Sequence, residues 1–134
     1  MNSSLRSVVC GLSLVACAAH ARLGPSDALP TGPWGGERAV LEVRQGGADI
    51  EFECAAGAVT APFILAEGGA FDLPGTFRPQ RPGPERGTDP AASAARYQGD
   101  VRGDTMTLTV VRGSDKWGPY TLTRGARPAL RKCR

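Results

Sequence analysis

The chain has 134 residues, the length of a single domain, and a formal net charge of +3. Acidic and basic residues are interspersed, so the charge is too small and too dispersed to indicate a nucleic-acid partner. The 18 glycines and 11 prolines predict many tight turns between short strands and argue against long helices.

Residues 1–21 have the features of an export signal. Arg6 supplies a positive charge near the start, and residues 7–16 form an apolar stretch. This stretch is too short to cross a bilayer as a helix, which takes about 20 residues. The segment is therefore predicted to be a signal peptide.

Two processing sites are compatible with this signal peptide. Residues 19–21 (AHA) have the small-x-small form that signal peptidase recognises, with cleavage after Ala21. Residues 14–17 (LVAC) instead resemble the lipobox of bacterial lipoproteins, in which the cysteine, here Cys17, is lipidated and attaches the protein to a membrane. A third alternative leaves the segment uncleaved as an anchor. Both cleaved forms predict an exported protein, either a periplasmic or outer-membrane lipoprotein or a freely secreted domain.

The cysteine count agrees with export. Cys10 and Cys17 lie in the leader, which leaves Cys54 and Cys133 as an even pair in the mature chain. Exported compartments are oxidising, so these two residues are predicted to form a disulfide. The bridge would close a loop of about 80 residues and stabilise the domain by about 4 kcal/mol in the chain-entropy model.

The mature chain is expected to begin with a tether and to continue as a β domain. Residues 22–33 contain three prolines and few apolar residues, which is typical of a flexible tether. Residues 34–134 are assigned to the domain, because the alternation of apolar and polar residues begins there. Two strands are predicted first, at 38–44 and 49–54, each with one apolar face. These faces consist of Ala39, Leu41 and Val43 in the first strand and Ile50, Phe52 and Cys54 in the second.

The opposite face of the second strand carries three carboxylates, Asp49, Glu51 and Glu53. A hard cation could bind such a stripe, but side chains on the solvated face of a half-buried strand follow the same pattern. We expect arginines of the neighbouring strand to pair with them, and no metal site is predicted.

The chain then turns at 55–57 into a strand at 59–65, where Pro62 predicts a sheet edge or a bulge. A strand at 70–77 follows. Residues 78–94 are polar and rich in proline, which indicates a long mobile loop. The remaining alternating segments are 97–101, 106–110 and 120–123, with a short last segment at 129–133.

These elements predict an all-β fold of seven or eight strands. Consecutive hairpins favour a small antiparallel up-and-down barrel, because closure removes exposed strand edges. A two-sheet sandwich is the alternative. The disulfide would then seal the barrel by joining an early strand to the last one.

A series of residues resembles a group of small secreted bacterial domains of unassigned activity. The series runs WGG at 34–36, FxC at 52–54, GxF at 69–71, YxGxVxGDxMxLxV at 97–110 and KC at 132–133. More loosely, an exported barrel with a disulfide to its C-terminal part is similar to the periplasmic C-type lysozyme-inhibitor lipoproteins. Those inhibitors insert a Ser-Gly loop into the lysozyme cleft, and Ser114-Asp115 is the nearest counterpart here.

The functional expectation is a non-enzymatic envelope or secreted domain. His20, the only histidine, lies in the leader, and bridged cysteines provide no thiolate, so neither a catalytic residue nor a cofactor is predicted. The domain is expected to bind a protein partner or a small apolar ligand, and the alternative is a proteinaceous inhibitor of a hydrolase such as lysozyme. A third and more distant class is an enzyme that uses carboxylates alone. Four aromatic residues are candidates for a ligand-binding barrel mouth: Trp34, Tyr97, Trp117 and Tyr120.

The leader predicts processing within residues 16–22 when the full-length chain is expressed in a bacterial host. Intact-mass spectrometry should find either a lipidated N-terminal Cys17 or a free N-terminal Arg22. An unmodified Arg22 would remove the lipoprotein alternative, and an intact Met1 in exported material would contradict both.

Overall fold

The computed structural model describes residues 28–84, 87 and 90–133 of the chain. The leader at 1–21, including Cys17, and the first part of the expected tether lie outside the described residues. Eight strands follow one another: β1 (Gly32–Gly35), β2 (Ala39–Arg44), β3 (Gly47–Phe52), β4 (Ala55–Val59), β5 (Ala70–Pro79), β6 (Ser93–Arg102), β7 (Thr105–Arg112) and β8 (Asp115–Arg124). A 3-10 turn, η2 (Glu67–Gly69), precedes β5.

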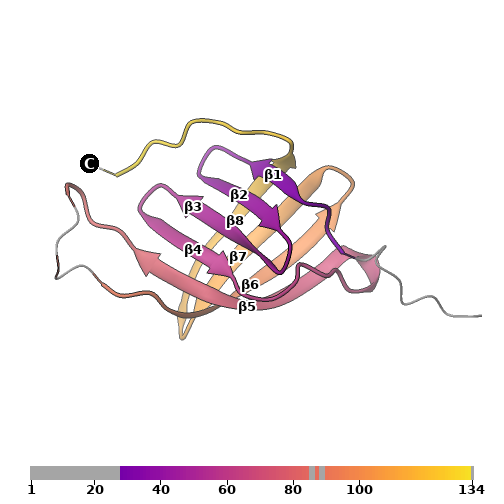
Figure 1. Cartoon of the computed structure of the whole chain (residues 1–134), viewed down its shortest axis with the longest axis horizontal. Helices are drawn as coiled ribbons and strands as arrows, with labels where there is room; N and C mark the ends of the chain where they lie inside the picture. Colours follow the sequence, from indigo (N-terminus) through magenta and orange to yellow (C-terminus); the bar gives the residue numbers. More distant parts are fainter. Residues whose placement is uncertain (1–27, 85–86, 88–89, 134) are drawn as a thin grey trace, which may run out of the picture.

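The strands form a closed antiparallel barrel in which each pairs with its neighbours in the sequence (Figure 1). The barrel closes where β1 pairs with β8, through Trp34 opposite Arg124 and Gly35 opposite Thr123. The predicted all-β barrel is confirmed, and the sandwich is not formed. None of the described residues forms a helix with the length and apolar character needed to cross a membrane.

Alternating side chains fill the interior of the barrel. The predicted inward face of β2 is buried as expected, and Ile50 and Phe52 of β3 are buried with it. The largest fully buried side chains are Trp34, Leu41, Val43, Ile50, Tyr97, Met106, Leu108, Val110 and Leu122. Burial of this apolar surface is the main stabilising contribution to the fold.

Two of the strands predicted in the first half of the chain, at 49–54 and 59–65, have other bounds in the structure. β3 ends at Phe52, so Cys54 does not continue its buried face but lies exposed in the turn before β4. The segment 55–57, predicted as a turn, begins β4, and Pro62 lies outside every strand. Small residues are needed in β4, because a Cβ at Gly57 would overlap the hydroxyl of Tyr97.

One end of the barrel is plugged by side chains, which we call the plugged end. Leu29 and Phe63 are buried there, and the Leu29 amide donates a hydrogen bond to the Phe63 carbonyl over 2.8 Å. The ring of Phe63 meets that of Phe71 edge-on, with centroids 4.9 Å apart. Residues 28–33 of the expected tether therefore belong to the domain, since they supply Leu29 and the start of β1.

The opposite end, which we call the open end, carries the loops at 36–38, 53–54, 80–92 and 113–114. The loop predicted at 78–94 is shorter than expected, because Arg78 and Pro79 continue β5 while Ser93 and Ala94 begin β6. Its residues 85–86 and 88–89 lie outside the described residues.

The C-terminal tail, residues 126–133, contains no strand, in contrast to the predicted last segment. It leaves β8 at the plugged end and returns along the outside of the barrel to the open end (Figure 1). Gly35 allows this course, because a Cβ there would overlap the Ala126 carbonyl oxygen. The Cys133 amide finally donates to the Glu53 carbonyl over 2.9 Å.

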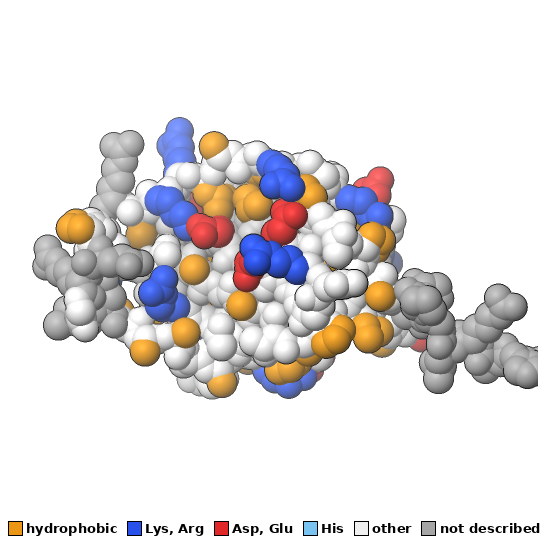
Figure 2. Space-filling model, in the orientation of Figure 1, with side chains coloured by type: hydrophobic (Ala, Val, Ile, Leu, Met, Phe, Trp, Pro, Cys, Tyr) orange, Lys and Arg blue, Asp and Glu red, His pale blue; other side chains and the backbone are white. Residues whose placement is uncertain are grey.

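Ion pairs hold the tail against β2 and β3. Arg127 pairs with Glu42 over 3.3 Å, while the Lys132 ammonium pairs with Glu51 and donates to the Phe52 carbonyl over 3.0 Å. Figure 2 shows basic side chains beside acidic ones on this face. Each exposed ion pair contributes only about 0–1 kcal/mol to the stability of the fold. Together the pairs fix the direction of the tail.

The packing of Tyr97 on glycine gives a test of the fold. A Cβ at Gly75 would overlap the Ala58 carbonyl oxygen and lie 2.7 Å from Cε2 of Tyr97, whereas one at Gly87 would meet nothing within 4 Å. Gly75→Ala should lower the free energy of unfolding by about 1–3 kcal/mol, and Gly87→Ala should leave it nearly unchanged. Urea denaturation measures both, and equal midpoints for the two variants would contradict this packing.

Candidate functional site

Four aromatic side chains from three strands form a row at the open end of the barrel. Trp117 stacks on Phe77 with ring centroids 4.4 Å apart. Phe77 lies 5.7 Å from Phe52, which in turn lies 5.1 Å from Tyr120. We call these four residues the aromatic row. Phe52 and Phe77 are buried, while Trp117 and Tyr120 at the two ends of the row are half-buried.

The antiparallel topology brings the row together. Phe52 and Phe77 stand at or near the ends of β3 and β5, and Trp117 follows the start of β8. In an up-and-down barrel, the ends of odd-numbered strands and the starts of even-numbered strands lie at the same rim. Inward-facing aromatic residues at these positions therefore converge.

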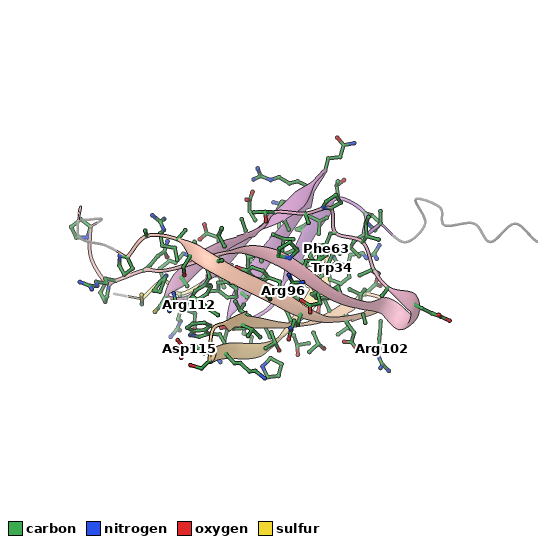
Figure 3. The ribbon with its side chains drawn as sticks, turned by 90° about the horizontal axis from the view of Figure 1, so that it is seen from below. Trp34, Phe63, Arg96, Arg102, Arg112 and Asp115 are labelled. Atoms are coloured by element: carbon green, nitrogen blue, oxygen red, sulfur yellow. The ribbon has the colours of Figure 1, made fainter. Side chains whose placement is uncertain are left out.

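An arginine guanidinium caps each end of the row. Cζ of Arg112 lies 5.0 Å from the ring centroid of Trp117 and 5.5 Å from that of Phe77. Cζ of Arg38 lies 5.7 Å from the ring centroid of Tyr120. These distances are typical of cation–π contacts. Figure 3 shows Arg112 and Asp115 at the same end of the molecule, opposite Arg102.

The row lines an open recess of about 200 Å³, which we call the aromatic recess. Its other lining residues are Arg38, Glu53, Cys54, Ala55 and Pro79. Pockets for drug-sized ligands occupy about 300–1,000 Å³, so this recess accommodates a smaller group, such as a single ring. The barrel interior below it is filled by the core side chains, and the recess is thus a feature of the rim.

Two of the four predicted mouth residues, Trp117 and Tyr120, line the aromatic recess. The other two lie inside the barrel. Trp34 is 1% exposed beneath the guanidinium of Arg124, and Tyr97 is fully buried. They act as core residues, because Trp34 is opposite Leu41 of β2 and Arg124 at the far end of β8, while Tyr97 is in the middle of β6.

Tyr97 is held in the core through its hydroxyl group. The hydroxyl donates to the Thr76 carbonyl over 2.6 Å, which satisfies the one polar atom of the side chain. Burial raises the pKa of Tyr97 well above its ordinary value. Burial also raises the pKa of Tyr120, against the opposing influence of Arg38, so both phenols are neutral at physiological pH.

A second recess adjoins the first and is more basic. It has a volume of about 230 Å³, and the tail and the β5–β6 loop form its walls. Glu53 and Pro79 line both recesses. The residues that give this basic recess its charge are Arg78, Arg81 and Lys132.

The two cysteines of the mature chain lie between these recesses. Both are free thiols in the structure, so the predicted disulfide is not formed there. A hydrogen bond with the Cys133 thiol raises the pKa of Cys54, and the nearby Glu53 carboxylate raises it further. Gln80 joins the pair, since its amide donates to the Cys54 carbonyl over 2.8 Å.

The carboxylate stripe of β3 is neutralised by basic side chains. Asp49 pairs with Arg44 over 2.5 Å, as expected for a neighbouring strand. Glu53 pairs with Arg38 over 3.3 Å, whereas Glu51 pairs with Lys132 of the tail. Within residues 28–84, 87 and 90–133, no group of three or more histidine, cysteine or acidic side chains is arranged to hold a metal ion.

Comparisons with known proteins found no similar protein. No protein-family model, no curated protein and no solved structure matches the chain. The resemblance to the lysozyme inhibitors therefore stays a hypothesis, and the site is interpreted from its own chemistry.

Proposed function

We propose that this chain is an exported, non-enzymatic binding domain whose aromatic recess takes a ring-sized apolar group. The observation that carries the proposal is the convergence of Phe52, Phe77, Trp117 and Tyr120 on one recess at the open end of the barrel. An apolar concavity with a few polar groups at its edge is the usual form of a small-ligand site. Phe52 and Phe77 also pack this end of the core, whereas Trp117 and Tyr120 are half-buried and leave ring surface accessible to a ligand.

The chemistry of the side chains supports a binding role over catalysis. The sequence contains no histidine after His20 that could act as a general base at neutral pH. The raised pKa of Cys54 keeps its thiol protonated and unsuited to nucleophilic attack. The carboxylates of β3 are engaged in ion pairs.

Export is part of the proposal and is supported by the leader at 1–21. We further propose that Cys54 and Cys133 form a disulfide in the exported protein. Its support is the closeness of the two segments, since the Cys133 amide donates to the carbonyl of Glu53, the residue before Cys54, and an oxidising compartment would convert two neighbouring thiols into a bridge. The bridge would fasten the tail to the rim beside both recesses.

Inhibition of a hydrolase such as lysozyme is the second candidate function. Its supporting observation is the start of the β5–β6 loop, which is anchored at the open end through Gln80 to Cys54 and Lys132. An anchored loop loses less conformational entropy when it inserts into a cleft.

If the disulfide forms, denatured and unreduced protein from the exported fraction should have no thiol that reacts with a labelling reagent. The same sample after reduction should bind two labels. Two labels before reduction would contradict the bridge.

The binding proposal is tested with benzamide, a neutral single-ring probe, in an NMR titration of the backbone amides. Saturable shifts are expected in β8 and at the end of β3. Trp117→Ala should weaken binding roughly five- to tenfold, because one of the walls of the recess is lost. Ile64→Ala is the matched control, since Ile64 is an apolar residue 52% exposed outside the recess. Absence of saturable shifts, or equal effects of the two variants, would refute the proposal.

A further inference from the structure

The guanidinium of Arg112 lies beside two rings of the aromatic row. Its Cζ is 5.0 Å from the centroid of Trp117 and 5.5 Å from that of Phe77, and these two rings are stacked on each other. Arg112 does not line the aromatic recess itself, but both rings that it contacts do. Its planar fork of N–H donors is therefore next to the Trp117 end of the recess.

These donors have only distant partners among the described residues. Nη1 lies 3.4 Å from Oγ of Ser93, and Nη2 lies 4.0 Å from Oδ2 of Asp115. Charge-assisted hydrogen bonds are shorter, at about 2.7–2.9 Å. Arg96 on β6 shows the difference, because its Nε lies 2.7 Å from Oδ1 of Asp72 and its Nη2 donates to the Asp72 carbonyl over 3.0 Å.

Arg38, at the other end of the row, forms a closer ion pair than Arg112 does. Its Nε lies 3.3 Å from Glu53, the carboxylate shared by the two recesses. A ligand anion near Arg38 would meet the negative charge of Glu53 at once. Arg112 also has a carboxylate neighbour, Asp115, but this one is farther away, at 4.0 Å, and more exposed to solvent than Glu53. The end of the row at Arg112 is consequently the better place for an anionic group.

The charge of the surrounding rim also favours an anion. Among the described residues, basic side chains outnumber the carboxylates at the two recesses and beside the aromatic row. The basic residues are Arg38, Arg81, Arg112 and Lys132. The carboxylates are Glu53, in the lining, Glu51, paired with Lys132, and Asp115, beside Arg112. A surplus of positive charge at a partly desolvated rim attracts anionic ligands.

We propose that the aromatic recess binds a small aromatic carboxylic acid, with its ring in the aromatic row and its carboxylate on the donors of Arg112. This inference rests on the proposed function and deepens it by naming the ligand class. The volume of about 200 Å³ limits the ligand to about one ring. The fork of Arg112 suits a carboxylate, which can accept two parallel hydrogen bonds from a guanidinium.

The test compares benzoate with benzamide, which have the same shape and differ in charge, using the full-length chain as it is exported. Benzoate should bind about tenfold more tightly, as expected for a hydrogen bond to a charged group. Arg112→Gln should abolish this preference while leaving benzamide binding in place. Arg102→Gln, at the opposite end of the molecule, is the matched control and should preserve the preference. Thermal melts of both variants establish that they are folded.

The possible results separate the two proposals. Equal binding of benzoate and benzamide would overturn the carboxylate inference and leave the proposed function standing. A preference for benzoate that persists in Arg112→Gln would also overturn it. If neither probe binds, both proposals fail. Binding of a peptide that ends in phenylalanine amide, without binding of either small probe, would likewise refute both proposals and assign the recess to a protein partner.

Discussion

Closure of the barrel depends on a very short seam. β1 has four residues, and only two of them pair with β8, whereas the other neighbouring strands share longer ladders. One further hydrogen bond extends the seam, from the Gly125 amide to the Pro33 carbonyl over 2.7 Å. Directly after it, the tail packs on Gly35 and begins its return to the open end. The same residues thus close the barrel and determine where the tail lies.

The tail links this seam to the candidate site. Lys132 binds Glu51 and the Phe52 carbonyl, so the residue that positions the tail also touches the backbone of the aromatic row. Its Nζ lies 3.5 Å from Oε1 of Gln80 at the start of the β5–β6 loop. The basic recess exists because these two segments meet. A loss of closure would therefore alter the site as well as the stability of the barrel.

The sequence allowed most of the fold to be predicted, because half-buried strands alternate. The buried faces of β2 and β7 match the predicted apolar positions, as do Ile50 and Phe52 in β3. β4 was missed because Ala55 to Ala58 contain no large residue, and alternation among small residues gives no signal. The requirement for small residues comes from the ring of Tyr97, which is distant in sequence.

The site was predicted only in part, for a related reason. Alternation of apolar and polar residues shows that an aromatic residue faces inward. Its position along the barrel axis depends on strand direction and register. Trp117 is near the start of its strand and reaches the rim, whereas Tyr97 lies mid-strand and fills the core. Phe52 and Phe77 could have been recognised from their places just before turns at the same end. The contact of Arg112 with two rings could not have been predicted from the sequence, because it depends on side-chain packing between β5, β7 and β8.

The two ends of the barrel differ in what they leave accessible. The described chain enters the barrel at the plugged end, where Leu29 is buried. The aromatic recess is at the other end, so the length of the barrel separates it from this point of entry. A substitution of Leu29 would therefore loosen the plugged end without altering any side chain that lines the recess.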